Sequence, residues 1–196
     1  MTRIALLLWA GLWLPGCRAF DPAWLAPVPA MLPAPLPALT AEVRIRHPRA
    51  IADSQRVAHD LRTLFAREVG EVLTDTAGPP RGFLVLTTHR VRYGEGGAYS
   101  YFTFLALGGL TPFGFPWTRH RCVVDVQLDV RNRRNELLAT YYGQGQAKAT
   151  GSLYSRTNYR RPERVVYLQC VRQGLAQIIP QLEPDVARLR RELARP

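Results

Sequence analysis

The sequence predicts an α+β domain with a mainly antiparallel sheet of four to five strands and two helices packed on one face, in the order β-α-β-β-β-α. Three observations support this fold class. Apolar and polar residues alternate through 121–130 and again through 136–148, as in half-buried strands. A polar turn at 132–135 joins these two segments into an antiparallel hairpin. Apolar residues recur every three or four positions through 50–73 and again after Pro162, as in amphipathic helices.

The first half of the domain contains a strand, a helix and a second strand. Residues 41–47 alternate in polarity and are ended by Pro48. The helix over 50–73 has an arginine-rich outer face and is stopped by Gly78-Pro79-Pro80. The second strand is expected at 81–93, which is rich in β-branched and aromatic residues.

The second half contains the hairpin and the last helices. Pro162 suits the first position of a helix, Pro180 and Pro184 are expected to interrupt that helix, and a short helix ends the chain. The polar face of the hairpin is expected to carry Asp125, Gln127, Asp129, Thr140, Gln144, Gln146 and Lys148. On the other face Gly143 and Gly145 lack side chains, which predicts that another segment approaches the sheet closely there.

The N-terminus reads as an export signal. Arg3 precedes an apolar run over 4–14 that is too short to span a bilayer, because a spanning helix needs about 20 residues. The run ends in Leu14-Pro15-Gly16-Cys17, which resembles the lipobox of bacterial lipoproteins. That resemblance implies cleavage before Cys17 and acylation of its thiol. The alternative is an ordinary signal peptide with an incidental cysteine.

The resemblance also implies a location and a domain organisation. Arg18 stands where an aspartate would resemble an inner-membrane retention signal, so the outer membrane is expected, with the protein on its periplasmic face. Residues 1–16 are then the signal peptide, 17–39 a proline-rich tether and 40–196 a single domain. The apolar residues of the tether could instead lie along the domain surface, namely Trp24, Leu25, Met31 and Leu32.

A wider resemblance rests on two further motifs. The chain is similar to a poorly characterised group of bacterial envelope lipoproteins that have an apolar insertion like "LGGLTPFGFP" and a strand pair like "D-V-x-N…Y-x-G-x-G". It bears a more distant likeness to the periplasmic domain of the curli-secretion channel lipoprotein and to lipoprotein activators of cell-wall synthases. These likenesses carry over no functional residue except Cys17.

The chain is strongly basic and has few cysteines. Its 26 Lys and Arg against 15 Asp and Glu give a formal charge of +11, which favours anionic neighbours such as lipid head groups or acidic proteins. Nucleic acid is not expected to meet an exported, lipid-anchored chain. Cys122 and Cys170 are both expected between the sheet and the helices, where they form either a disulfide or two buried thiols.

An aromatic, glycine-rich segment separates the second and third strands. It has no charged residue from Gly96 to Thr118, although connecting loops usually lie on the polar surface. It could extend and cover the sheet, dock on a partner or another subunit, or insert into a bilayer as a hairpin. The candidate contact residues are Tyr99, Tyr101, Phe102, Phe104, Phe113, Phe115 and Trp117.

A second candidate site lies just before the last long helix. Within "YSRTNYRRPER" the anion-binding candidates are Arg156, Arg160, Arg161 and Arg164, because guanidinium groups bind phosphate and carboxylate and helix N-termini favour anions. The alternative is a solvated loop.

The sequence contains no recognisable catalytic motif. The four histidines lack the spacing of metal ligands, there is no Gly-x-Ser-x-Gly elbow, and Asp125 and Asp129 fit charge balance on a solvated face. We therefore expect no enzyme activity, no metal and no cofactor. The expected function is that of a lipid-anchored periplasmic binding or accessory protein of an outer-membrane assembly, with a protein partner or further copies of itself. The alternatives are a ring-forming secretion or pore component that inserts 98–117, and a cell-wall or lipid hydrolase.

Overall fold

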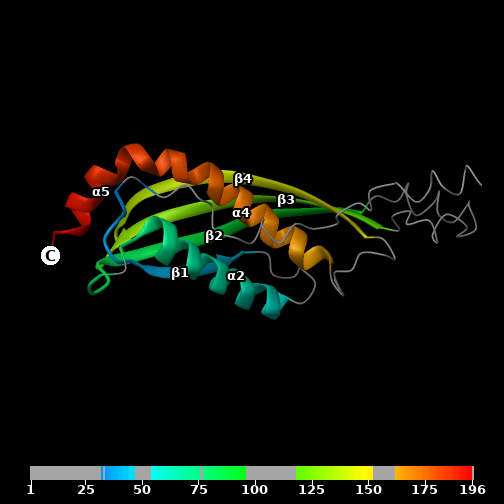
Figure 1. The fold of residues 1–196 in the computed structure, drawn as a ribbon, viewed down its shortest axis with the longest axis horizontal. Helices are drawn as coiled ribbons and strands as arrows, with labels where there is room; N and C mark the ends of the chain where they lie inside the picture. Colours follow the sequence, from blue (N-terminus) through cyan, green and yellow to red (C-terminus); the bar gives the residue numbers. More distant parts are fainter. Residues whose placement is uncertain are drawn as a thin grey trace, which may run out of the picture.

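The computed structural model describes residues 32, 34–46, 54–75, 77–95, 118–151 and 162–195. Cys17, the aromatic contact candidates from Tyr99 to Trp117, and Arg156, Arg160 and Arg161 lie outside these residues. Figure 1 shows a long sheet with the helices on one of its faces. The elements, in order, are β1 (Thr40–Ile45), α2 (Ser54–Glu68), a π-helical turn (Val69–Leu73), β2 (Gly82–Glu95), β3 (Thr118–Asn132), β4 (Leu137–Gly151), α4 (Pro162–Leu182), a 3₁₀ turn (Glu183–Asp185) and α5 (Val186–Leu193).

The sheet has four strands in the order β1-β2-β3-β4, and it is mixed. The β2–β3 and β3–β4 pairs are antiparallel, as predicted. β1 runs parallel to β2, with Thr40 opposite Phe83 and Ile45 opposite Thr88. The predicted antiparallel arrangement is therefore confirmed for β2, β3 and β4 but not for β1. Parallel neighbours need a crossover connection, and the chain between β1 and β2, which includes α2, provides it.

A bulge in β2 changes which residues face outward. Thr88 pairs with Val126 and Val91 with Val124, so β2 contains one residue more than β3 over this stretch. The extra residue keeps Val91 on the core side, in phase with Thr88. His89 and Arg90 consequently both lie on the opposite face, beside β3.

The core fills the space between the sheet and the helices. Leu61 and Phe65 of α2 and Tyr167 of α4 are fully buried there. The Tyr167 hydroxyl donates a hydrogen bond of 3.0 Å to Oγ1 of Thr88, so this polar pair is satisfied within the core. Burial raises the pKa of Tyr167 to about 12, which keeps the phenol neutral at physiological pH.

The packed domain begins before the Thr40 boundary that the sequence predicts. Leu32, Leu36 and Leu39 are buried in the core, although they belong to the proline-rich segment. The Leu36 amide donates to the Leu73 carbonyl at 2.9 Å, and the Asp75 amide donates to the Leu36 carbonyl at 2.7 Å. The spaced leucines thus hold the end of this segment against the domain.

The helix α4 lies very close to β4. A Cβ atom on Gly143 would come within 2.2 Å of the Gly174 carbonyl oxygen, and one on Gly145 within 1.6 Å of the Cys170 carbonyl oxygen. The predicted close approach is therefore confirmed, and the segment that approaches is α4. The helix also continues past Pro180 to Leu182, where an interruption was expected, because a proline near the end of a helix removes only one late hydrogen bond.

Candidate functional site

The face of the sheet opposite the helices is polar. Asp125, Gln127 and Asp129 of β3 point to this open face, while Val124, Val126 and Leu128 point into the core. On β4 the same alternation places Thr140, Tyr142 and Gln144 opposite them. The predicted polar face of the hairpin is therefore confirmed.

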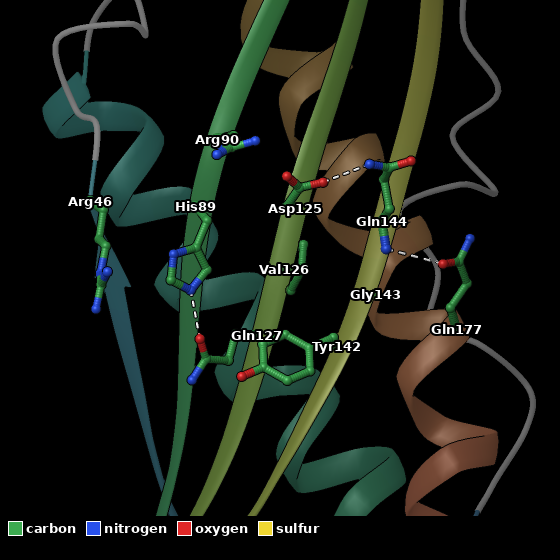
Figure 2. A pocket seen from close by; sticks show the side chains of 10 residues that line it. All are labelled: Arg46, His89, Arg90, Asp125, Val126, Gln127, Tyr142, Gly143, Gln144 and Gln177. Carbon is green, nitrogen blue, oxygen red and sulfur yellow. Dashed lines mark hydrogen bonds between the residues drawn. The ribbon is translucent and has the colours of Figure 1, made fainter.

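An open groove of about 770 Å³ runs across this face (Figure 2). Side chains from β2, β3, β4 and α4, together with the residue that follows β1, surround it. The lining residues are Arg46, His89, Arg90, Asp125, Val126, Gln127, Tyr142, Gly143, Gln144 and Gln177.

A chain of hydrogen bonds fixes one side of the groove. His89 Nε2 donates to Gln127 Oε1 at 2.7 Å, and Gln127 Nε2 donates to Asp129 Oδ1 at 2.8 Å. Thr140 Oγ1 donates to the same carboxylate oxygen at 2.9 Å, and Arg131 donates to the other at 3.3 Å. Because an amide oxygen only accepts, His89 carries a hydrogen on Nε2, and a neutral ring presents Nδ1 as an acceptor.

A second set of hydrogen bonds fixes the other side. Gln144 Nε2 donates to Asp125 Oδ1 at 2.7 Å, and the Gln144 backbone amide donates to Gln177 Oε1 of α4 at 3.0 Å (Figure 2). The groups that surround the groove are therefore held in place before any ligand arrives, which lowers the entropy that binding would cost.

Positive charge is concentrated at this part of the face. Arg46 and Arg90 line the groove, and Asp125 is the acidic residue among the lining residues. Further along, Arg92 is opposite Val123, and Arg121 is opposite Lys148. All of these cationic side chains are exposed. On β1 itself, Arg44 donates a hydrogen bond to Glu42, which raises the pKa of Arg44. That cation is therefore already paired.

The helix α4 also covers the outer edge of β4. Three of its glutamines, Gln173, Gln177 and Gln181, follow one another at intervals of one helical turn. Gln173 Oε1 accepts from the Gln146 amide at 2.8 Å, and Gln181 Nε2 donates to the Tyr142 carbonyl at 2.9 Å. With the bond from Gln144 to Gln177, these contacts satisfy backbone groups that an edge strand would otherwise expose.

Of the predicted anion-binding residues, Arg164 is the one that the structure describes. Its guanidinium forms an ion pair with Asp60 of α2, so it joins the two helices. This partner lies on a helix far away in the sequence. That Arg164 also contributes to an anion site stays a prediction.

The two predicted core cysteines are buried and unbridged. Cys170 Sγ donates to the Cys122 carbonyl oxygen at 3.0 Å. The neighbouring Cys122 and burial raise the pKa of the Cys170 thiol, which keeps it protonated. Of the two alternatives that the sequence leaves open, the structure contains two buried thiols.

The side chains on the groove are of kinds that can bind a ligand. Within the described ranges, no group of three or more His, Cys, Asp or Glu side chains is arranged to hold a metal ion. In the same part of the chain, no helix has the length and apolar character needed to cross a membrane. Amides, guanidinium groups, one imidazole and one phenol can bind a polar or anionic ligand.

Sequence reasoning missed the outward position of His89 and Arg90. A bulge was detectable only as a break in alternation within "TTHRV", and nothing local fixes the residue at which it occurs. It also missed the glutamines on α4, whose spacing of four was visible but whose partner strand was not.

Neither a protein-family model nor a curated protein matches the sequence. Among solved structures, a minor lipoprotein from Acinetobacter baumannii is similar with a TM-score of 0.30 and 14% identity, over 80% of this chain and 96% of that one. A predicted lipoprotein from Caulobacter crescentus is similar with a TM-score of 0.28 and 8% identity, over 78% of this chain and 90% of that one. At these scores the two similarities carry no argument about this chain's activity.

Proposed function

We propose that this chain is a lipid-anchored accessory protein of the bacterial envelope that acts by binding and not by catalysis. The anchor is Cys17 after cleavage of residues 1–16, on the outer membrane and facing the periplasm. The contact region is the aromatic segment 98–117. The sequence supports the anchor through its lipobox, and it supports the contact region through a run of aromatic residues without charge.

The observation that carries the proposal is the placement of the ends of the strands. The proline-rich segment reaches β1 at the end of the sheet where the Arg81 amide donates to the Ala38 carbonyl. The pairs Glu95–His120 and Thr118–Gly151 mark the opposite end. β2 has 14 residues and separates these ends by about 45 Å, given a rise of about 3.3 Å per residue.

Segment 96–117 therefore leaves and rejoins the sheet at the end farthest from the proline-rich segment. The arginine-bearing segment 152–161 leaves β4 at the same end, after Gly151. The predicted contact region and the segment that carries most of the predicted anion-binding residues are thus both attached at the end of the sheet farthest from the point where the proline-rich segment joins the fold.

The lipid anchor is tested by mass spectrometry and fractionation of the full chain expressed in a bacterial envelope. The expected result is an acylated N-terminal cysteine and recovery in the outer-membrane fraction. A Cys17→Ala variant should retain the signal sequence and lose acylation. Unmodified Cys17 in a soluble wild-type fraction would contradict the anchor.

The contact region is tested by cross-linking in membranes. A Phe102→Ser, Phe104→Ser, Phe113→Ser variant should lose the cross-linked species that the wild type forms. Leu137→Ser is the matched control, because Leu137 is 54% exposed and lies at the opposite end of the sheet. If the triple variant gives the same cross-linked species as the wild type, 98–117 is not the contact region.

A ring-forming secretion or pore component is the second candidate. The observation that favours it is that β2 and β3 are still paired at Glu95–His120, so segment 96–117 begins and ends on adjacent strands, as a membrane-inserted hairpin must. Light scattering on the detergent-extracted, lipidated protein distinguishes the two candidates. A closed oligomer supports the ring, and a monomer excludes it.

A further inference from the structure

We propose that the open face of the sheet is a binding surface for an anionic glycan, a chain of sugar rings that carry carboxylate groups. The ring of Tyr142 would pack against a sugar, while Arg46 and Arg90 would bind carboxylates. This surface is separate from segment 98–117 and from Cys17, so the inference goes beyond the proposed function and does not depend on it.

The shape of the groove suits an extended ligand. The groove is open to solvent and crosses β2, β3 and β4 at the level of the β2 bulge (Figure 2). A small ligand would be poorly enclosed there, because small-molecule sites bury most of the ligand surface. A polymer can instead contact several positions along the strands at once.

Tyr142 provides the aromatic surface. Its side chain is 64% exposed, and it is one of two large apolar side chains that are exposed among the described residues. It lies directly opposite Gln127 in the β3–β4 register, next to the groove. A phenol ring offers an apolar face for the C–H groups of a sugar and a hydroxyl for its polar edge.

The amides beside Tyr142 suit sugar hydroxyls. A hydroxyl both donates and accepts, so it is best matched by side chains that also do both. Gln127 and Gln144 each have a second amide hydrogen beyond the bonds to Asp129 and Asp125. Because these bonds already fix the amides, little side-chain entropy remains to be lost on binding.

The charges select an anionic chain. Arg46 and Arg90 line the groove, and Arg92, Arg121 and Lys148 continue the positive charge along the same face toward the end of the sheet. Guanidinium groups bind carboxylates with two parallel hydrogen bonds. A neutral glycan would offer these cations no carboxylate to bind.

An acidic peptide is the competing ligand, and one observation and one chemical argument weigh against it. Extended peptides commonly bind to a sheet by pairing with an edge strand. Here the outer edge of β4 is occupied by Gln173, Gln177 and Gln181. A peptide also has no particular need for the exposed ring of Tyr142.

The test uses the chain from Cys17 to Pro196 with Cys17→Ser, which retains every described residue and needs no lipid. Calorimetry compares oligogalacturonate, a neutral chito-oligosaccharide of equal length, and polyglutamate. We expect oligogalacturonate to bind about tenfold or more tightly than either, since one charge-assisted pair or one stacked ring is enough for about a factor of ten.

The variants distinguish the contribution of the aromatic ring to binding from the contribution of the positive charge. Tyr142→Ala and Arg90→Gln should each weaken binding about tenfold, and Tyr142→Phe should restore most of it. The controls Leu137→Ala and Arg190→Gln remove an exposed apolar and an exposed basic side chain at the other end of the molecule, and they should leave binding unchanged. Thermal midpoints confirm that each variant is folded.

Two results would overturn the proposal. Equal affinity for polyglutamate, together with no effect of Tyr142→Ala, would identify the face as a site for acidic peptides. Absence of binding to all three probes would remove the ligand site altogether. Neither result bears on acylation of Cys17 or on segment 98–117, so the proposed function stands or fails separately.

Discussion

Gly145 of β4 lies directly against the backbone of Cys170 in α4, so closely that a Cβ atom would fall 1.6 Å from the Cys170 carbonyl oxygen. The obstacle is backbone, so it cannot move aside as a flexible side chain would. The distance between α4 and the sheet is thus set by the absence of a side chain at this position.

Substitution of Gly145 by alanine should therefore separate α4 from β4. We expect Gly145→Ala to lower the free energy of unfolding by about 3 kcal/mol, at the upper end of overpacking effects. Gly94→Ala is the matched control, because a Cβ atom there would meet nothing within 4 Å. Urea unfolding measures the free energy of unfolding of both variants. Equal decreases in the two variants would contradict the close packing of α4 against Gly145.

The bond between Tyr141 and Asp185 predicts a pH-dependent contribution to stability. The Tyr141 hydroxyl donates to Asp185 at 2.8 Å, and this bond, with help from Arg188, lowers the pKa of the carboxyl. The folded-state pKa is then below the unfolded one. The stabilisation is fully present above the unfolded pKa of about 4 and is lost as the pH falls through the folded value.

We expect Tyr141→Phe to cost about 1 kcal/mol near pH 7, which corresponds to a shift of about 2–4 °C in the melting temperature. The difference from wild type should shrink below pH 4. Tyr142→Phe is the control, since that side chain is mostly exposed. Melting curves between pH 3 and 7 measure the effect, and a difference that grows on acidification would contradict the assignment.

The two core cysteines should be unreactive until the chain unfolds. Cys122 and Cys170 are fully buried, and the raised pKa of Cys170 disfavours the thiolate that reacts with thiol reagents. In a Cys17→Ser background, we expect no labelling by DTNB under native conditions. In denaturant without reductant, both thiols should react. Failure to label them in denaturant would mean that they form a disulfide.

The glutamines of α4 should keep β4 from pairing with other chains. Gln173→Ala with Gln177→Ala removes the acceptors for the amides of Gln146 and Gln144. Alanine is at least as good a helix former as glutamine, so α4 itself should not weaken. We expect self-association by light scattering, with Gln55→Ala on the exposed face of α2 as the control. A variant that stays as dispersed as the wild type would show that the edge needs no cover.

Local patterns predicted most of the elements, and topology explains what they missed. The hairpin of β3 and β4 was predictable because alternation and a short turn are local features. The direction of β1 relative to β2 is a longer-range property, because it depends on how the chain between the two strands crosses over the sheet.

Contacts far apart in the sequence account for the remaining differences. The ion pair of Arg164 with Asp60 spans 104 positions, so no spacing rule could have predicted it. The burial of Leu36 was hidden by the prolines around it, which favour an extended chain but do not say whether it packs. The bulge that turns His89 and Arg90 outward depends on the register with β3.

The hydrogen bonds of Leu36 to Leu73 and Asp75 limit how far the domain can move from the membrane. If the lipid is attached at Cys17, residues 17–31 connect the bilayer to Leu32, the first described residue, and 15 residues extend to about 50 Å at most. A force applied along this connection acts on the Leu36 hydrogen bonds before it acts on β1. These bonds therefore protect the sheet from force that is transmitted from the anchor.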